Sequence, residues 1–349
     1  MLKNHKQNSI GGLNIQKKMK SIVNPSGFAS VSLTSLYLAA ERARESAHPQ
    51  ALINDPMASY LAEGKGFEIL KQVMSFSEHS QLVPWTGIRT KELDEYVSDC
   101  IIDKGISQVV ILACGCDTRP FRLKFPDSVA QNVSWFLTDL SPVVSEVSGA
   151  ISSKLAESGE LLCQNFKKVE YHPLDLRETA SWENFVSTSG FDSSLPSIVV
   201  LEGLLEYIPY PGVCNIMNNA RSFLMCEGSF ICGTATNMAT IKPHPAAVPL
   251  VNLMQFFKDM GAEPVFGTND PLADILCSNG FEATHMICSC DKEIVEPILR
   301  GSEEVIAQLK RFLRTKEEGI TEIVSYIPMN FLWFGGKGIT KKEIEKEEP

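Results

Sequence analysis

Short apolar runs, bounded by turn-forming residues, recur along the middle of the chain. Most of them do not alternate with polar residues, and each is separated from the next by enough chain for a helix. Strands of a parallel sheet that is covered on both faces have this pattern. The five runs are residues 108–113, 135–138, 169–174, 197–201 and 229–234.

A different rhythm precedes these runs. Apolar residues recur every three or four positions over residues 31–46, and again over 93–101 up to Gly105, which predicts two amphipathic helices. Asn54-Asp-Pro56 interrupts the chain between them, and a short helix is expected at 57–61. The sheet therefore carries an N-terminal helical addition.

The last part of the chain completes the predicted sheet. Residues 271–278 predict a helix, 282–287 a strand, and 323–334 a final strand that pairs antiparallel with it. An insertion after the fifth strand, about 237–269, holds three prolines between residues 243 and 249 that interrupt any regular element. The expected fold is a doubly wound α/β sheet of seven strands whose last strand is antiparallel.

Composition narrows the class of protein. The 349 residues include 32 Lys and Arg against 42 Asp and Glu, a formal net charge of −10, which argues against a nucleic-acid-binding surface. No apolar run approaches the roughly 20 residues of a membrane span, and no signal peptide is recognisable. We expect a disordered leader at 1–30, whose basic start also resembles an organelle transit segment, a single domain at 31–336, and a charged flexible tail at 337–349.

Ten cysteines are scattered along the chain, many of them inside apolar runs. The pairs Cys114/Cys116 and Cys288/Cys290 are separated by one residue rather than the two usual in zinc knuckles, and no histidine lies at a suitable distance. We therefore expect reduced thiols, a cytoplasmic protein and no metal site.

Glycine or acidic residues follow four of the predicted strands. Gly115 follows the first and Asp139 the second, 24 residues beyond that glycine; Asp175-Leu176 and Glu202-Gly203 follow the third and fourth. A glycine turn lets the backbone approach a nucleotide-type cofactor, and a distal carboxylate can hold ribose hydroxyls. In doubly wound sheets ligands bind outside these strand ends, so we expect a site there.

These residues belong to a series of segments that resembles the leucine carboxyl methyltransferase family, whose members transfer a methyl group from S-adenosylmethionine (SAM). The segments include INDPMA at 53–58, VVILACGCDTR at 109–119 and EGLLEY at 202–207, in an order that spans roughly residues 33–334. The resemblance implies a class I methyltransferase, or Rossmann-like, fold and SAM as cofactor. The remaining segments are 36–46, 87–90, 138–140 and 175–178.

The resemblance also implies roles for individual residues. Gly115 would pass beneath the methionine part of SAM, and Asp139 would accept both ribose hydroxyls. Asp175 would take the amino group of adenine, and the Leu176 N–H would meet a ring nitrogen.

The charged ends of the cofactor would meet further residues. Arg89 would pair with its carboxylate and Glu202 would face its ammonium group. A basic residue of the first helix would help, either Arg42, which fits the motif and is favoured slightly, or Arg44, which fits by its distance to Asp55. The family often has glycine where this chain has Ala113, which leaves the strength of cofactor binding open.

The implied reaction is an O-methylation, and we favour a carboxylate acceptor on a small molecule. A carboxylate is ionised at pH 7 and needs no general base, and Arg119 or Arg177 could clamp it. A hydroxyl acceptor would instead need a base such as Asp117 or His172. Some family members methylate the C-terminal leucine of a protein phosphatase, which is the alternative acceptor. A branch that acts on a tRNA base fits the acidic charge least.

Two readings from other classes stay open. An NAD(P)-dependent oxidoreductase would share the glycine turn and the distal acid, although the chain lacks a complete G-x-G-x-x-G. A catalytically silent scaffold would keep the fold and lose the cofactor, which Ala113 makes conceivable.

Overall fold

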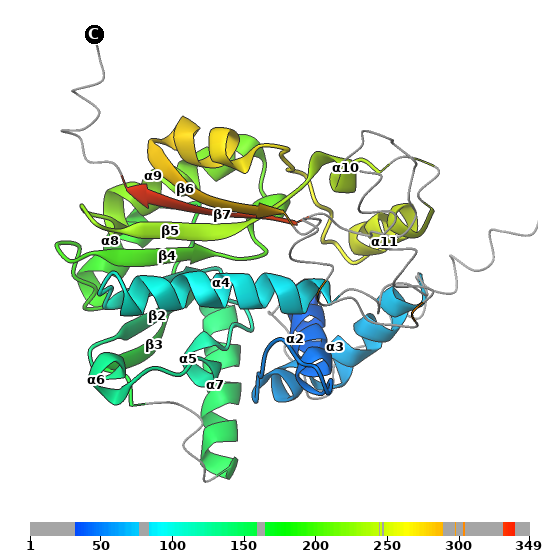
Figure 1. Ribbon diagram of the computed structural model, residues 1–349, viewed down its shortest axis with the longest axis horizontal. Coiled ribbons are helices and arrows are strands. Elements are labelled where there is room, and N and C mark those ends of the chain that lie inside the picture. Colours follow the sequence, from blue (N-terminus) through cyan, green and yellow to red (C-terminus); the bar gives the residue numbers. More distant parts are fainter. Residues whose placement is uncertain are drawn as a thin grey trace, which may run out of the picture.

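The computed structural model describes residues 32–76, 84–158, 165–243, 245, 248–288, 297, 303 and 331–338. They form a seven-stranded sheet in the order β3-β2-β1-β4-β5-β7-β6, with helices against both faces (Figure 1). Strands β1 to β5 are parallel, and β7 pairs antiparallel with both β5 and β6. The strands are β1 (Gln108–Leu112), β2 (Ser134–Asp139), β3 (Lys168–Pro173), β4 (Ser197–Leu201), β5 (Phe230–Thr236), β6 (Phe281–Cys288) and β7 (Phe331–Gly338).

The central strands explain why apolar runs marked the sheet so well. Every residue of β1 and β4 is buried, because neighbouring strands and helices enclose both faces. In the register, Leu112 lies opposite Thr138 of β2, and Ile111 lies opposite Val200 of β4, so the three strands end close together at one edge. The predicted doubly wound α/β class is confirmed.

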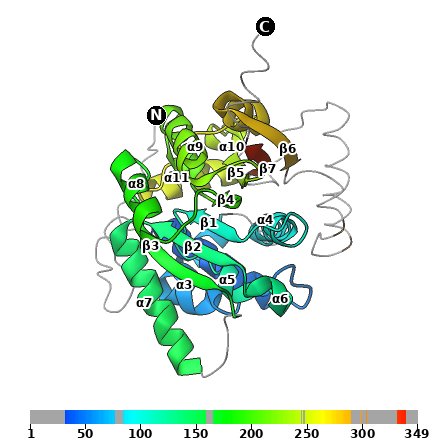
Figure 2. The same cartoon turned by 90° about the vertical axis from the view of Figure 1, so that its left-hand side faces the viewer.

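Helices cover the two faces of the sheet through separate apolar cores. On one face α4 and α6 pack against Val109, Ile111 and Trp135, and on the other α8 and α9 pack against Val110 and Phe136. Figure 2 shows these helices on opposite sides of the strands. The helices are α4 (Trp85–Ile102), α5 (Arg119–Arg122), α6 (Asp127–Ala130), α7 (Ser141–Ser158), α8 (Thr179–Thr188) and α9 (Tyr210–Leu224).

A third core joins the helical addition to the edge of the sheet where β1, β2 and β4 end. It brings α2 (Leu33–Ser46) and α3 (Ala58–Met74) against α7 and α11 (Val248–Asp259). Figure 1 shows α2, α3 and α11 at one side of the sheet. The predicted first helix is therefore present, with the Ser32 hydroxyl accepting from the Ser35 N–H at its start. The predicted helix at 57–61 is much too short, because apolar residues on one face of α3 continue into this core.

The insertion after β5 differs from its prediction, which allowed no regular element. It contains α10 (Met238–Ile241) and α11, and Pro249 is the second residue of α11. A proline fits there because the first turn of a helix has no intrahelical partner for its N–H groups.

The helix predicted at 271–278 is found as two irregular turns, Leu272–Leu276 and Cys277–Asn279, ending at Gly280 with φ +76°. The described part of the final strand, Phe331–Gly338, runs past the predicted strand end at 334 and the expected domain end at 336. Gly336 allows this, since a Cβ there would lie 3.0 Å from the Leu276 side chain and 3.1 Å from the Glu282 carbonyl. The predicted leader at 1–30, residues 323–330 of the predicted strand and residues 339–349 of the predicted tail lie outside the described residues.

None of the helices in the described part of the chain combines the length and the apolar character that crossing a membrane requires.

The backbone turns sharply after β1. Ala113 has φ +51°, the left-handed region that L residues other than Asn and Asp rarely adopt, and Gly115 follows with φ +46°. Ala113 is the only non-glycine residue with a positive φ among the described residues. The position where the family often has glycine is therefore one where this chain holds a methyl group in a strained conformation.

We predict that Ala113→Gly stabilises the protein. Relief of the left-handed strain, about 1–2 kcal/mol, outweighs the greater freedom of glycine in the unfolded chain, so the unfolding free energy should rise by roughly 0.5–1 kcal/mol. Thermal unfolding followed by circular dichroism should show a midpoint about 1–3 °C higher. Ala150→Gly, within α7, is the matched control and should cost about 1 kcal/mol. A lower midpoint for Ala113→Gly would contradict the strain argument.

Candidate functional site

A cavity of about 400 Å³ lies where β1, β2 and β4 end. One wall is a face of α2 up to Arg42, and a second is the turn after β1. The ends of β2 and β4, Arg89 of α4, Val143 of α7 and residues 261–263, just after α11, supply the rest. Its volume lies in the range of small-molecule and cofactor sites.

The α2 wall is one face of that helix. Thr34, Ser35, Leu38 and Arg42 line the cavity, and their spacing places them within an arc of about 100°. Leu38 supplies apolar surface, while the other three supply hydroxyl and guanidinium groups. The Ser35 Oγ accepts the Cys116 N–H at 2.9 Å and so ties this wall to the turn after β1.

The turn after β1 and the end of β2 are joined by Asp139. Its Oδ2 accepts the Gly115 N–H at 2.8 Å and its Oδ1 accepts the Leu140 N–H at 2.7 Å. A Cβ at Gly115 would collide with the Ser35 side chain, and the positive φ also favours glycine there. This pair of residues was predicted 24 positions apart, and the structure brings them into contact at the cavity.

Burial raises the pKa of Asp139, although the two backbone N–H groups oppose that shift. Each carboxylate oxygen has used one acceptor position on the backbone and has another that can accept a hydroxyl group.

Arg42, rather than Arg44, faces the cavity. Its Nε donates to the Asp55 Oδ2 at 2.8 Å, and its Nη2 donates to the Cys116 carbonyl at 2.6 Å. Arg44 is partly exposed, pairs with Glu41 at 2.6 Å and is not among the cavity residues. Arg42 therefore holds the turn after β1 from the side of α2, and Asp55 fixes its guanidinium.

Asp55 also binds the turn itself. Its Oδ2 accepts the Thr118 hydroxyl at 2.5 Å, and its Oδ1 accepts the Met57 N–H at 3.1 Å at the start of α3. Burial alone would raise the pKa of Asp55, but Arg42, Arg122 and Thr118 lower it below its usual value. The carboxylate therefore stays ionised and fastens α2 and α3 to the sheet.

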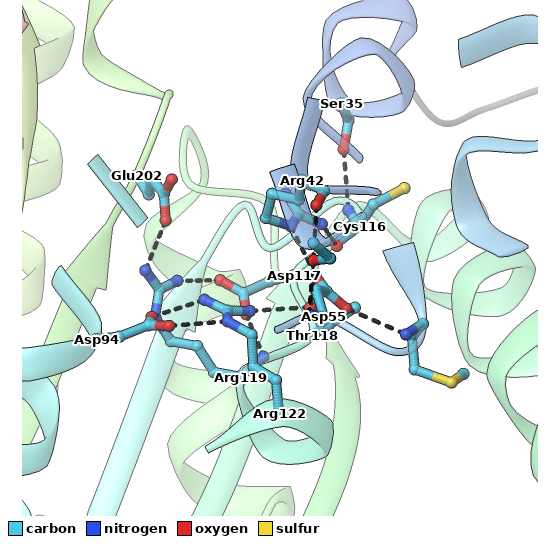
Figure 3. Close-up of polar contacts among 12 residues, drawn as sticks. Ser35, Arg42, Asp55, Asp94, Cys116, Asp117, Thr118, Arg119, Arg122 and Glu202 are labelled. Atoms are coloured by element: carbon cyan, nitrogen blue, oxygen red, sulfur yellow. Dashed lines mark hydrogen bonds and ion pairs between the residues drawn. The ribbon is translucent and has the colours of Figure 1, made fainter. Parts of the chain in front are cut away.

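Arg119 is the centre of a buried network of charges (Figure 3). Its side chain is fully buried and contacts Asp117 through Nη1, Glu202 through Nη2 at 2.6 Å, and Asp94 through Nε at 3.0 Å. Arg122 donates to Asp94 at 2.6 and 2.8 Å and to the Thr118 hydroxyl at 2.8 Å. Through Thr118 the network continues to Asp55 and Arg42.

Arg89, the fifth residue of α4, completes this network. Its Nε donates to the Glu202 Oε1 at 2.9 Å. Burial would raise the pKa of Glu202, but Arg119 and Arg89 lower it well below its usual range. With Arg42 and Arg122 the network holds four guanidinium groups and four carboxylates, so its formal charges cancel.

Asp94 shows that burying the charge network opposes the ionisation of its carboxylates. Burial raises the pKa of its carboxyl, and the two arginines that contact it, Arg122 and Arg119, only partly oppose that effect. A buried carboxylate without such partners would take up a proton, so the arginines keep it charged.

A small recess of about 30 Å³ adjoins the cavity and shares four wall residues with it, namely Thr34, Leu38, Arg89 and Tyr207. Most of its wall surface is apolar, with Met254 and Phe257 from α11, and Tyr37, Thr236 and Thr240 add polar groups. Glu206, in the short helical turn Leu205–Tyr207 after β4, also lines the recess. Burial raises the pKa of Glu206.

Five of the seven residues predicted for the site line the cavity: Arg42, Arg89, Gly115, Asp139 and Glu202. Arg89 and Glu202, predicted to meet opposite charges of one ligand, are found paired with each other.

The other two, Asp175 and Leu176, follow β3 and are not among the cavity residues. The Asp175 carboxylate accepts two hydrogen bonds from the Arg177 side chain, at 2.6 and 2.8 Å, and one from the Arg177 N–H at 3.0 Å, which lower its pKa to about 2. The sequence correctly placed Asp175 at the end of a strand, on the same edge of the sheet as the cavity. However, β3 is the outermost strand of the sheet, so Asp175 lies to one side of the cavity.

The residues suggested for acceptor chemistry are placed unfavourably for it. Arg119 is fully buried in the charge network and cannot clamp an acceptor, and Arg177 is exposed and paired with Asp175. His172 packs between the rings of Phe136 and Phe185 and contacts Glu170, away from the cavity.

Asp117 does line the cavity, but both its oxygens contact arginines. Arg119, Arg177, His172 and Asp117 were suggested from their positions near strands alone. Such positions do not reveal ion pairs between residues that are distant in sequence.

The sequence missed Asp94, Arg122 and Ser35. Asp94 pairs with Arg119 and Arg122, which lie 25 and 28 positions further along the chain. A carboxylate on an otherwise apolar helical stripe, Leu93 to Val97, was the available signal. Asp55 was noted only as part of a chain break.

Seven cysteines are free thiols, four of them buried, and burial raises the pKa of Cys114 and Cys232. No group of three or more histidine, cysteine or acidic side chains within the described ranges has the spacing of a metal site.

Comparison with known proteins places these features in a family. A model of the family "Leucine carboxyl methyltransferase" matches residues 35–220. A Mycobacterium avium protein, provisionally named an S-adenosyl-L-methionine-dependent methyltransferase, is 32% identical over 215 residues, which are 58% of this chain and 66% of that protein. A Mycobacterium marinum protein with the same provisional name is 30% identical over 236 residues, covering 63% of this chain and 69% of the relative.

Solved structures support the fold. A Streptomyces avermitilis protein of the DUF574 family has a TM-score of 0.57 at 11% identity, covering 88% of this chain and 98% of its own. A Thermobifida fusca protein, provisionally described as a methyltransferase, has a TM-score of 0.54 at 14% identity, covering 91% of this chain and all of its own. At these identities the likeness concerns the fold alone.

We predict that Glu202→Gln lowers the unfolding free energy at pH 7 by about 3 kcal/mol, because it leaves Arg119 and Arg89 without their shared carboxylate. The folded pKa of Glu202 is depressed, so its stabilisation is present above the unfolded pKa and is lost as the pH falls through the folded value. The gap between wild type and variant should be constant from pH 6 to 8 and narrow below about pH 4.5.

Urea unfolding at several pH values measures this gap. Glu183→Gln, on the exposed face of α8, is the matched control and should change little at any pH. A gap that widened towards acid would show that Glu202 is not held ionised by the two arginines.

Proposed function

This chain belongs to the leucine carboxyl methyltransferase family, and we propose that it is an O-methyltransferase that uses SAM to methylate a carboxylate, or a hydroxyl, of a small molecule. The observation that carries the proposal is the cavity at the strand ends, where Gly115, Asp139, Arg89 and Glu202 meet. Bound SAM would supply an electrophilic methyl group on a sulfonium. The residues of this chain bind and orient the reactants.

The residues fit the ribose of such a cofactor. Asp139 is fixed by two backbone N–H groups and keeps acceptor capacity on each oxygen. The left-handed turn at Ala113 and Gly115 brings the backbone beside this carboxylate without a side chain at Gly115. A rigid carboxylate next to a glycine turn is the arrangement that nucleotide-type ligands need.

The paired charges of Arg89 and Glu202 suit the zwitterionic end of the cofactor. The lowered pKa of Glu202 keeps it anionic, so it can face an ammonium group. Arg89 and Glu202 lie beside Gly203, whose φ of +64° and lack of a Cβ leave space, since a Cβ there would be 3.8 Å from an Arg89 nitrogen. Each formal charge of the ligand would thus gain an opposite charge.

Asp175 and Leu176 remain our proposed contacts for adenine. They follow the strand next to β2, and the Leu174 N–H donates to the Asp139 carbonyl at 2.8 Å, which links the two strand ends. For this role the Asp175 carboxylate would have to exchange its bonds to Arg177 for the adenine amino group.

The acceptor is proposed to be a carboxylate for a chemical reason. Methyl transfer is an in-line displacement that depends on placing the acceptor oxygen close to the methyl group. A carboxylate arrives ionised at neutral pH and needs no base. This agrees with a cavity in which Asp117 is paired with arginines and His172 is absent from the lining.

A small molecule is favoured over a protein C-terminus by the shape of the site. The recess that adjoins the cavity has room for one small group, and its walls are mostly apolar. A protein C-terminus is the alternative acceptor, and a phosphatase-derived peptide ending in leucine tests it directly.

Isothermal titration of the full chain with SAM and with NAD(P) tests the cofactor. We expect heat from SAM and none from NAD(P). The reverse result would favour an oxidoreductase, and heat from neither would favour a silent scaffold.

We predict that Asp139→Ala weakens SAM binding by about 1.5–3 kcal/mol, or roughly 10–150-fold, because a charged acceptor of hydrogen bonds is lost. Asp103→Ala, an exposed aspartate at the end of α4, is the matched control and should bind normally. Equal binding by both variants would remove Asp139 from the cofactor site.

Incubation with methyl-labelled SAM and a metabolite extract tests the bond that is formed. Methyl esters release labelled methanol in alkali, whereas ethers and N-methyl products keep the label. Alkali-stable product alone would exclude carboxylate methylation and leave a hydroxyl or a nitrogen as the acceptor.

A further inference from the structure

We propose that Glu206 and the recess around it select acceptors that carry a hydroxyl group, which forms a hydrogen bond with the Glu206 carboxyl group. This inference rests on the function proposed for the adjoining cavity, because it assigns the acceptor end of the same site. It makes Glu206 a residue that determines specificity, in addition to those that hold the cofactor.

The first observation is an unsatisfied carboxylate. Glu206 is only 5% exposed, and its Oε2 has no hydrogen-bond partner among the residues that the structure describes. Leaving a buried acceptor unpaired costs roughly 1–3 kcal/mol, and more for a charged group. A folded protein keeps such a group where a ligand or a tightly held solvent molecule completes it.

The second observation is where this carboxylate lies. The recess that Glu206 lines adjoins the main cavity, and the two share wall residues, including Arg89 and Tyr207. A molecule bound in the cavity next to Arg89 can therefore place one substituent in the recess while the rest stays near the strand ends.

The size and charge of the recess define the substituent. A volume of about 30 Å³ is close to that of one water molecule, so a hydroxyl fits and a ring does not. An ammonium group would also donate to Glu206, but Arg89 lines the same recess and its positive charge disfavours a second cation. A neutral donor is the remaining choice.

The recess is held in shape by the insertion after β5. The Glu206 carbonyl accepts the Val265 N–H at 2.7 Å and the Phe266 N–H at 3.1 Å, which docks the end of the insertion onto the turn that carries the carboxylate. Phe257 of α11 packs against Tyr37 of α2 with ring centroids 6.1 Å apart. These apolar walls suit an acceptor whose hydroxyl is attached to a hydrocarbon or aromatic frame.

The test compares carboxylic acids that differ by one hydroxyl group. Ligand-observed NMR titrations of the full chain, with and without S-adenosylhomocysteine, use benzoate against 3- and 4-hydroxybenzoate, and phenylacetate against 4-hydroxyphenylacetate. In wild type, the hydroxylated member of at least one pair should bind at least about tenfold tighter, because the analogue without the hydroxyl leaves Glu206 unpaired.

Glu206→Leu should reduce this preference to less than about twofold and leave S-adenosylhomocysteine binding unchanged. Glu206→Gln keeps one acceptor oxygen and should retain part of the preference, which also covers the case in which the leucine variant does not fold. Glu183→Leu on α8 is the matched control and should keep the full preference.

Two results would overturn the inference: no preference for a hydroxyl in any wild-type pair, as expected if the recess holds only a structural water, or a preference that survives in Glu206→Leu. A failure of wild type to bind S-adenosylhomocysteine would instead count against the proposed function, and the titrations without it would still report on the recess.

Discussion

The structure depends on keeping one fully buried guanidinium, that of Arg119, in an environment that satisfies it. An unpaired ion at this depth would cost far more than any single packing contact supplies. Its three carboxylate partners come from α4, from the turn after β1 and from the end of β4. Their positions are therefore fixed relative to one another, and these same elements form the walls of the cavity.

The network also explains how a helical addition distant in sequence becomes part of a site at the sheet edge. Arg42 and Asp55 extend the chain of charges to α2 and α3, while Thr118 links them to Arg122. Because opposite charges are equal in number, a ligand that itself carries both signs can bind without leaving an uncompensated ion. The geometry thus favours a zwitterion over an ion of one sign.

Much of the fold was predictable because strands that are buried on both faces of the sheet consist almost entirely of apolar residues. β1 and β4 were located to within a residue since each is an unbroken apolar run. The boundaries of α3 and β7 were not, because contacts with distant elements decide where they end: the third core for α3, and Leu276 against Gly336 for β7.

The residues of the site likewise fall into those that the sequence predicted and those that it did not. Gly115 and Asp139 follow from local spacing, and Arg42, Arg89 and Glu202 from a family resemblance. Asp94 and Glu206 were missed, since their roles come from pairing or from the lack of it across long stretches of chain. The proposed acceptor role of Arg119 was wrong for that reason, because a strand-end position does not reveal three carboxylate partners.

The docking of the insertion on the Glu206 carbonyl has a consequence for how this protein can diverge. The insertion is attached to the Glu206 carbonyl through the main-chain N–H groups of Val265 and Phe266, which any residue except proline could supply. The ion pairs of the charge network depend instead on particular side chains. Within the described residues, α11 contributes no member of that charge network. Side chains of α11 can therefore be exchanged to accommodate new acceptors, while the adjoining cavity is inherited intact.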